Sequence, residues 1–310
     1  MGTVEFGIMP WFYLESLARD FRQVASLEEI GYDAIWTGDH LFVPRYGPTF
    51  DAFTVLAALA VTTRRARIGS AVALVPLRPP ALVAKEATTV DLLSGGRLLL
   101  GVGVGGEFPW EFAACGVETR ERGRRMDEAL PLLRRLWRGE EVSYAGSCFR
   151  LERFRLEPLP CQPGGPPLWV GGRSRRALRR AALLGDGYMP YLVSPEGYRQ
   201  ELALLRHWAA EAGRDPSAVT PAIFLFVALA DSLEEGRARA ARFLDERYGP
   251  RDFGPIVQHC VPAGTLRDCR AMLERFVEAG ARHLVLTPIA PQAEFLQHAA
   301  ALAYLVARLR

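Results

Sequence analysis

The stretch IWTGDHLFVPRYGP, residues 35–48, begins with apolar residues and then places a threonine, a glycine, an aspartate and a histidine at consecutive positions. The apolar residues, with Asp33 and Ala34 before them, predict a short buried strand. The alternative is that Asp39 only caps the next segment, and a single histidine is often structural. In an α/β barrel, however, this end of a strand carries the catalytic side chains. Asp39 and His40 are therefore our first candidates for catalytic residues.

The same kind of apolar run recurs along the chain. Buried strands are predicted for VEFGIM (4–9), DAIWTG (33–38), ARIGSAVALV (66–75), RLLLGVGVG (97–105), PLWVGG (167–172), DGYMPYL (186–192), AIFLFVALA (222–230) and RHLVLTP (282–288). Apolar residues at helical spacing predict helices over 14–30, 53–63, 81–93, 124–137, 177–184, 198–212, 233–247, 267–279 and 292–310. Eight strands alternating with helices predict an α/β fold, the (β/α)8 TIM barrel.

An open, doubly wound sheet is the alternative topology. It is disfavoured because PWFYLES follows the first strand, where a dinucleotide-binding fold has a glycine-rich turn that opens a helix. We predict one barrel domain over residues 1–310 with two short insertions. A hairpin is expected near 140–167, where two β-rich stretches flank Gly146, and a loop-rich segment is expected near 248–264.

The composition excludes several classes of function. Hydrophobic residues make up 49% of the chain and charged residues 24%, which is typical of a globular protein. The net charge is +3, but basic and acidic residues are intermingled, so nucleic-acid binding is not expected. No apolar run reaches the ~18 residues of a membrane span, and the N-terminus lacks the pattern of a signal peptide. We therefore expect a cytoplasmic protein without a membrane partner.

Metal and Schiff-base chemistry are also disfavoured. The five histidines are scattered singly and the five cysteines show no C-x-x-C spacing, so no metal site is predicted. Lys85, the only lysine, lies in a predicted helix, whereas Schiff-base catalysis in a barrel requires a lysine at a strand end. Chemistry on a bound cofactor remains, in which the protein supplies position and polarity.

Glycine-rich turns follow two of the predicted strands. One contains Gly103 and Gly105, and the other is GGRS, residues 171–174, which leads directly into a predicted helix. Backbone N–H groups in such a turn, together with the positive end of a helix, bind anions. Glycine used only for a tight bend is the alternative for either turn alone. Because both turns share one rim with aromatic residues, the expected ligand is a flat, phosphorylated ring system.

Several of these motifs are familiar. The chain resembles the luciferase-like monooxygenase superfamily, and most closely its deazaflavin (coenzyme F420)-dependent oxidoreductases, through GYDAIWTGDHLFVP, LAALAVTTRRARIGSAVALVPLRPP, ATTVDLLSGGRLLLGVGVGGEF, RGRRMDEALPLLRRLW, PPLWVGGRSRRALRRAALLGDGYMP and GTLRDCRAMLERFVEAGARHLVL. The resemblance runs over roughly residues 3 to 290. It implies a barrel that is commonly a homodimer and holds the cofactor ring in its mouth.

The resemblance also implies roles for individual residues. Asp39 takes the place of the residue that contacts the ring, and His40 that of its partner in polarising ring or substrate. Ala71 and Val72 fall where the family has a non-prolyl cis peptide in a bulge behind the ring. The cofactor's side chain and phosphate are expected to contact Gly103, Val104, Gly105, Gly171, Gly172, Arg173 and Ser174.

The substrate is less defined. Relatives that oxidise sugar phosphates use lysine for the phosphate, and the absence of lysine at any strand end disfavours that substrate class. GGEFPWEF is bulkier than the small or acidic residues common after this strand, so we expect Phe108, Trp110 and also Trp11 to shape a mostly apolar substrate pocket.

Three functions remain open. The first is hydride transfer between coenzyme F420 and an unidentified small organic substrate. The second is an FMN-dependent monooxygenase that acts with a flavin reductase, because both ring systems are flat and carry a phosphate on a side chain. The third is a barrel that binds flavin or deazaflavin without catalysis, because a fold alone does not establish a function.

Overall fold

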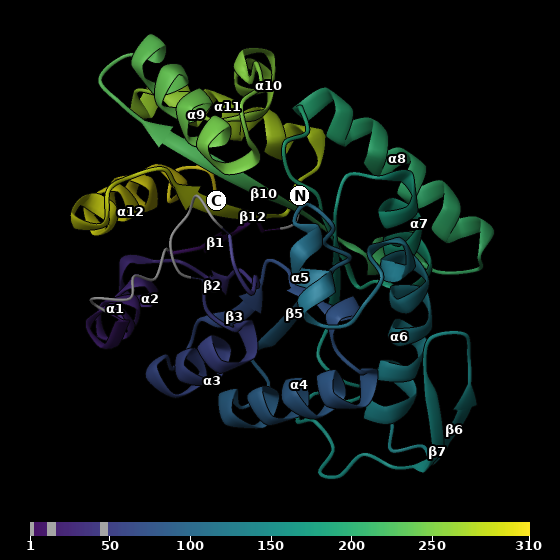
Figure 1. Ribbon diagram of the computed structural model, residues 1–310. Coiled ribbons are helices and arrows are strands. Elements are labelled where there is room, and N and C mark those ends of the chain that lie inside the picture. The colour runs from purple at the N-terminus through teal and green to yellow at the C-terminus, as the bar shows by residue number, and fades with distance from the viewer. Residues whose placement is uncertain (1–2, 11–16, 44–48) are drawn as a thin grey trace.

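Eight parallel strands form a closed barrel in the computed structural model, which describes residues 3–10, 17–43 and 49–310 (Figure 1). The strands, in the order in which they pair around the barrel, are β1 (Glu5–Ile8), β2 (Ala34–Thr37), β3 (Arg67–Ser70), β5 (Leu98–Gly103), β8 (Leu168–Gly171), β9 (Gly187–Met189), β10 (Thr220–Leu229) and β12 (His283–Pro288). The pairing of β12 with β1, in which Glu5 lies beside His283, closes the ring. The predicted TIM barrel is confirmed.

Helices cover the outside of the barrel. They are α1 (Leu17–Val24), α2 (Leu27–Ile30), α3 (Ala52–Thr62), α4 (Pro80–Ser94), α6 (Arg122–Trp137), α7 (Arg175–Leu184), α8 (Pro195–Glu211), α9 (Leu233–Tyr248), α11 (Leu266–Ala279) and α12 (Phe295–Val306). Several begin at a side chain that caps the first turn, as Asp51 does for α3 and Ser174 for α7. No helix in the described ranges is long and apolar enough to cross a membrane.

Two details depart from the sequence prediction. The run predicted as one strand over 66–75 is divided into β3 and the short β4 (Ala73–Leu74), with a cis peptide between Ala71 and Val72. The segment 248–264 is not simply loop-rich, because it contains α10 (Gly254–Cys260) and β11 (Ala263–Gly264). The short apolar pattern of α10 lacks the length that marks a helix in sequence.

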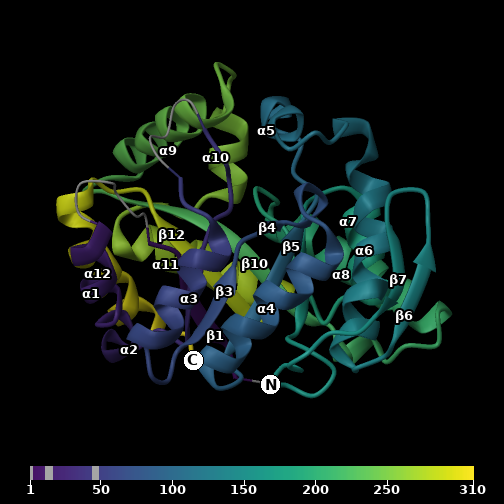
Figure 2. The same ribbon diagram turned by 60° about the horizontal axis from the view of Figure 1, so that its bottom comes forward.

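The insertions leave the barrel intact. The predicted hairpin is formed by β6 (Val142–Ala145) and β7 (Arg150–Phe154), which pair antiparallel outside the barrel beside α6 (Figure 2). A short helix that was not predicted, α5 (Pro109–Ala114), follows β5. In Figure 2, α5 and the helices α9 and α10 stand at the same end of the barrel, around the ends of the strands that precede them.

The barrel interior is filled by large side chains. The ring of Trp169 lies 5.3 Å from that of Trp36 and 4.9 Å from the imidazole of His283. Neighbouring strands carry glycine where these rings need room, since a Cβ at Gly69 would overlap Trp36 and one at Gly187 would lie 2.6 Å from Trp169. The interior is thus a packed core, and the chemistry is confined to the barrel mouth.

Candidate active site

A cavity of about 710 Å³ opens at the C-terminal ends of the strands. Its walls include the polar residues that follow β2, the bulge after β3 and the glycine turns that follow β5 and β8. From the predicted site, the residues that line it are Asp39, His40, Ala71, Val72, Gly103, Val104, Gly105, Gly171 and Gly172. Stretches of sequence up to about 130 residues apart therefore meet at one concave surface, as expected for a barrel.

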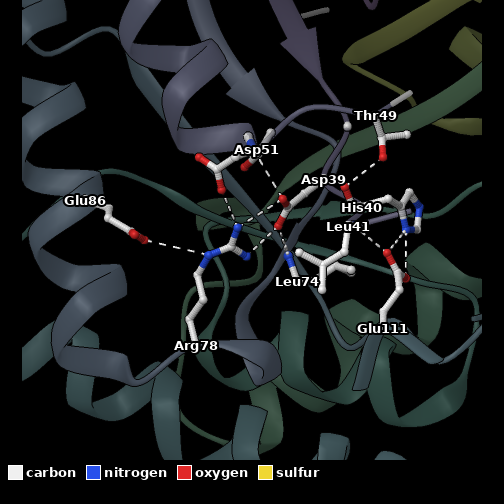
Figure 3. A network of polar contacts seen from close by, with 12 residues as sticks. Asp39, His40, Leu41, Thr49, Asp51, Leu74, Arg78, Glu86 and Glu111 are labelled. Carbon is white, nitrogen blue, oxygen red and sulfur yellow. Dashed lines mark hydrogen bonds and ion pairs between the residues drawn. The ribbon is translucent and has the colours of Figure 1, made fainter. Parts of the chain in front are cut away.

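Asp39 is buried and its carboxylate is saturated with hydrogen bonds (Figure 3). Oδ2 accepts from the backbone N–H of Leu74 and from Arg78 Nη1, both at 2.8 Å. Oδ1 accepts from Arg78 Nη2 at 3.2 Å and from the N–H of Ala52 at 3.3 Å. A carboxylate offers about four lone pairs, so these donors use its acceptor capacity.

His40 forms a pair with a residue that the sequence did not identify. Its Nδ1 lies 3.1 Å from Glu111 Oε2, and Glu111 is almost completely buried on α5. Glu111 Oε1 also accepts from the N–H of Leu41 at 2.6 Å (Figure 3). The carboxylate therefore fixes both the backbone beside His40 and the orientation of its imidazole, and Nε2 is the ring nitrogen left for a ligand.

The bulge at Ala71–Val72 fits between two of the predicted glycines. A Cβ on Gly171 would lie 2.7 Å from Val72 Cγ1, and a Cβ on Gly103 would overlap Cγ2 of the same side chain. Because real Cβ atoms essentially never approach so closely, glycine at both positions is what admits the valine side chain. The cis peptide itself is the feature that the family resemblance implied for this place.

The GGRS turn contributes its glycines to the cavity. Gly172 has φ +118°, a conformation that favours glycine, and lines the wall with Gly171. Ser174 instead caps α7 by accepting from the N–H of Ala177. Arg173 places its guanidinium 4.8 Å from the ring centroid of Tyr191, which does line the cavity. Arg173 and Ser174 thus support the rim without forming the wall.

The aromatic wall lies elsewhere than expected. Phe108 packs edge-to-face against His40 at 5.3 Å, and Trp110 donates its indole N–H to the carbonyl of Phe42; neither lines the cavity. Trp11 lies outside the described residues. The apolar side chains that do line the far half of the cavity include Phe224, Phe226, Phe243, Tyr248 and Ile289.

Comparison with known proteins identifies the family of this chain. Residues 6–283 match the family described as luciferase-like monooxygenase. The chain belongs to this family. Family members are oxidoreductases or monooxygenases, so this luciferase-like protein is an enzyme of that broad kind.

The similar proteins include a ketoreductase, an alcohol dehydrogenase and a monooxygenase. The phthiodiolone/phenolphthiodiolone dimycocerosates ketoreductase of Mycobacterium tuberculosis is 33% identical in an alignment 251 residues long, and the match covers 72% of this chain and 65% of the ketoreductase. The match thus spans slightly less than two thirds of that relative. An F420-dependent secondary alcohol dehydrogenase in complex with an F420-acetone adduct superposes with a TM-score of 0.85 at 21% identity, covering 100% of both chains. The monooxygenase RslO1 from Streptomyces bottropensis gives 0.82 at 25% identity, covering 97% of this chain and 98% of its own.

Some residues of the site in this luciferase-like protein were not predicted from the sequence. Glu111 lies 71 residues after His40, on a helix too short to be predicted, so no local pattern connects the two. Phe224 and Phe226 do follow the alternation of a strand, and this period would have pointed both side chains to one face of the barrel. Within the described ranges, no three His, Cys, Asp or Glu side chains are grouped so as to hold a metal ion.

Proposed function

We propose that the protein transfers a hydride between coenzyme F420 and a small, largely apolar ketone or secondary alcohol. The observation that carries the proposal is the His40–Glu111 pair at the wall of a cavity that also holds the glycine turns and the bulge. The 33% identity to a ketoreductase supports a carbonyl or its alcohol as the substrate.

The cavity fits a flat ring with a phosphorylated side chain. Val72, seated against Gly103 and Gly171, presents an apolar surface, and Gly172 lines the same wall. These residues would hold the cofactor, with the turn before α7 beside its phosphate. Bound deazaflavin supplies or accepts the hydride. The protein residues then have to bind, orient and exclude water.

His40 is the proposed acid and base. In the reducing direction, the substrate carbonyl carbon gains the hydride while its oxygen gains the proton from His40 Nε2; oxidation reverses both transfers. Glu111 holds Nδ1 and so presents Nε2 to the substrate. The apolar half of the cavity, formed by Phe224, Phe226 and Ile289, would accept the carbon skeleton of the substrate.

Asp39 has a different role in this proposal from the one expected from sequence. With four donors on its carboxylate, it holds the strand end in place and contributes to the cavity wall, and His40 carries the proton.

The test is a side-by-side titration of the purified protein with F420 and with FMN, followed by cofactor fluorescence. We expect F420 to bind tightly and FMN weakly, and reduction of ketones to consume reduced F420. Tight binding of FMN alone would overturn the proposal. Oxygen consumption with reduced FMN would then establish a monooxygenase, supplied by a flavin reductase. Binding of F420 without turnover across a panel of ketones and alcohols would support a non-catalytic barrel.

We also propose a homodimer, as the family resemblance implies. Three exposed leucines of α4, Leu82, Leu92 and Leu93, and the exposed Val61 of the adjacent α3 are apolar side chains that a second copy would cover. Sedimentation equilibrium should give twice the chain mass of 34.3 kDa. A mass of one chain at all concentrations would exclude the dimer.

A further inference from the structure

Arg78, which was not singled out from the sequence, contacts three carboxylates behind the active-site wall. It follows the 3₁₀ turn Val75–Leu77, and its side chain is only 14% exposed. The guanidinium forms a two-pronged pair with Asp39 and a third bond, of 2.6 Å, from Nη2 to Asp51 (Figure 3). Nε lies 3.9 Å from Glu86 on α4.

These bonds join segments that belong to different βα units. Asp39 lies directly before His40 in the loop after β2, and Asp51 caps the first turn of α3. Leu74, whose N–H donates to the same Asp39 oxygen, belongs to β4, two residues beyond the Ala71–Val72 peptide. Asp39 and Arg78 together therefore tie His40 to the bulge, although the two lie on opposite sides of β3 in the sequence.

The guanidinium of Arg78 balances the negative charge of the carboxylates around it. The Asp39 side chain is 4% exposed, and its one cationic partner among the described residues is Arg78. Asp51 and Glu86 add negative charge around the same guanidinium. Removal of one partner from a buried pair leaves an uncompensated charge that must be expelled or neutralised. The only lysine, Lys85, cannot substitute, because its Nζ donates to the carbonyl of Glu157.

We infer that Arg78 is a positioning residue of the cofactor site: through Asp39 it sets His40 and the Ala71–Val72 bulge against the same ligand. It does not line the cavity and does not touch the reacting atoms. The inference rests on the proposed function for its effect on F420, and on geometry alone for its effect on His40.

The experiment compares Arg78→Ala and Arg78→Lys with a matched control, Arg180→Ala. Arg180 is 8% exposed and forms a two-pronged pair with Asp127, but it joins α7 to α6 away from the cavity. Arg78→Lys keeps the positive charge but cannot form the two-pronged pair with Asp39. Thermal unfolding of all three variants measures the cost to the fold, and the lysine variant preserves the test if Arg78→Ala does not fold.

Two readouts separate positioning from general stability. We expect the Kd for F420 to rise at least about tenfold in both Arg78 variants, a change of 1.4 kcal/mol, and kcat to fall about 100-fold. Arg180→Ala should stay within about twofold of the wild type in both, whatever its effect on the melting temperature. The second readout needs no cofactor: the imidazole resonance of His40, assigned by its absence in His40→Gln, should shift in both Arg78 variants and not in Arg180→Ala.

Different results would overturn the proposed function and the positioning role of Arg78. Wild-type protein that binds no F420 would overturn the proposed function, and the imidazole resonance would still decide the role of Arg78. Wild-type affinity and an unmoved His40 resonance in Arg78→Lys would overturn the positioning role even if F420 binds tightly.

Discussion

Glu111 determines how His40 can act, although it contacts neither cavity nor ligand site directly. Its two oxygens are shared between an imidazole and the backbone N–H of Leu41, so one buried carboxylate sets ring and main chain together. Such a partner fixes which ring nitrogen carries the proton. His40 was identified from the sequence, whereas Glu111, which orients its imidazole, was not.

Glu111→Gln should therefore lower kcat by about ten- to 100-fold while the protein stays folded. The amide oxygen still accepts from the N–H of Leu41, but the negative charge that holds the His40 imidazole is lost. The measurement is steady-state turnover of the best F420 substrate with the circular dichroism spectrum as the check on folding. His40→Gln should be at least as severe, and the double variant no worse than His40→Gln alone. Losses that multiply in the double variant would show that the two residues act independently.

At the scale of elements, the site depends on a fit between the bulge and the ends of β5 and β8. Val72 occupies space that only glycine leaves at Gly103 and Gly171. The strands were predicted from their apolar runs, and the eight of them were confirmed, because burial on both faces is visible in composition. The fit between them was not predictable, since it is a property of one side chain and two glycines brought together by closure of the barrel.

Gly103→Ala should weaken F420 binding about tenfold and lower the melting temperature, because the added Cβ must displace Val72. Val72→Ala in the same chain removes the overlapping methyl group and should restore most of the melting temperature. Fluorescence titration and thermal unfolding of the two single variants and the double variant measure both effects. Equal destabilisation of Gly103→Ala with and without Val72→Ala would contradict the proposed overlap.

For the whole molecule, closure of the barrel places a titratable ring in its interior. His283 is completely buried against Trp36 and Trp169, and its Nδ1 lies 3.0 Å from Glu5 Oε2 on the neighbouring strand. Burial lowers the pKa of His283 below its usual value, and the bond to Glu5 opposes this only in part. The histidine thus serves the core and does not line the cavity.

Acid should accordingly destabilise the fold from near neutral pH. Because the pKa of His283 is lower in the folded chain, the unfolded chain binds more protons below pH ~6.5, and stability is lost as the pH falls from there. The melting temperature of the wild type should fall between pH 7 and pH 5, and His283→Gln should show a flatter dependence. His207→Gln, at an exposed helix position, is the control and should follow the wild type. Parallel curves for wild type and His283→Gln would assign the acid sensitivity to other groups.

The cavity has two walls that come from separate parts of the chain. Lining residues from the described parts of the chain between Thr37 and Glu107, with Gly171 and Gly172, form the wall assigned to the cofactor, while β10, α9 and the residues after β12 supply the aromatic wall assigned to the substrate. Mutations in the second part can therefore accumulate without disturbing the first. Under the proposed function, a library confined to residues 224–248 and 289–294 should exchange one substrate for another while the cofactor stays the same.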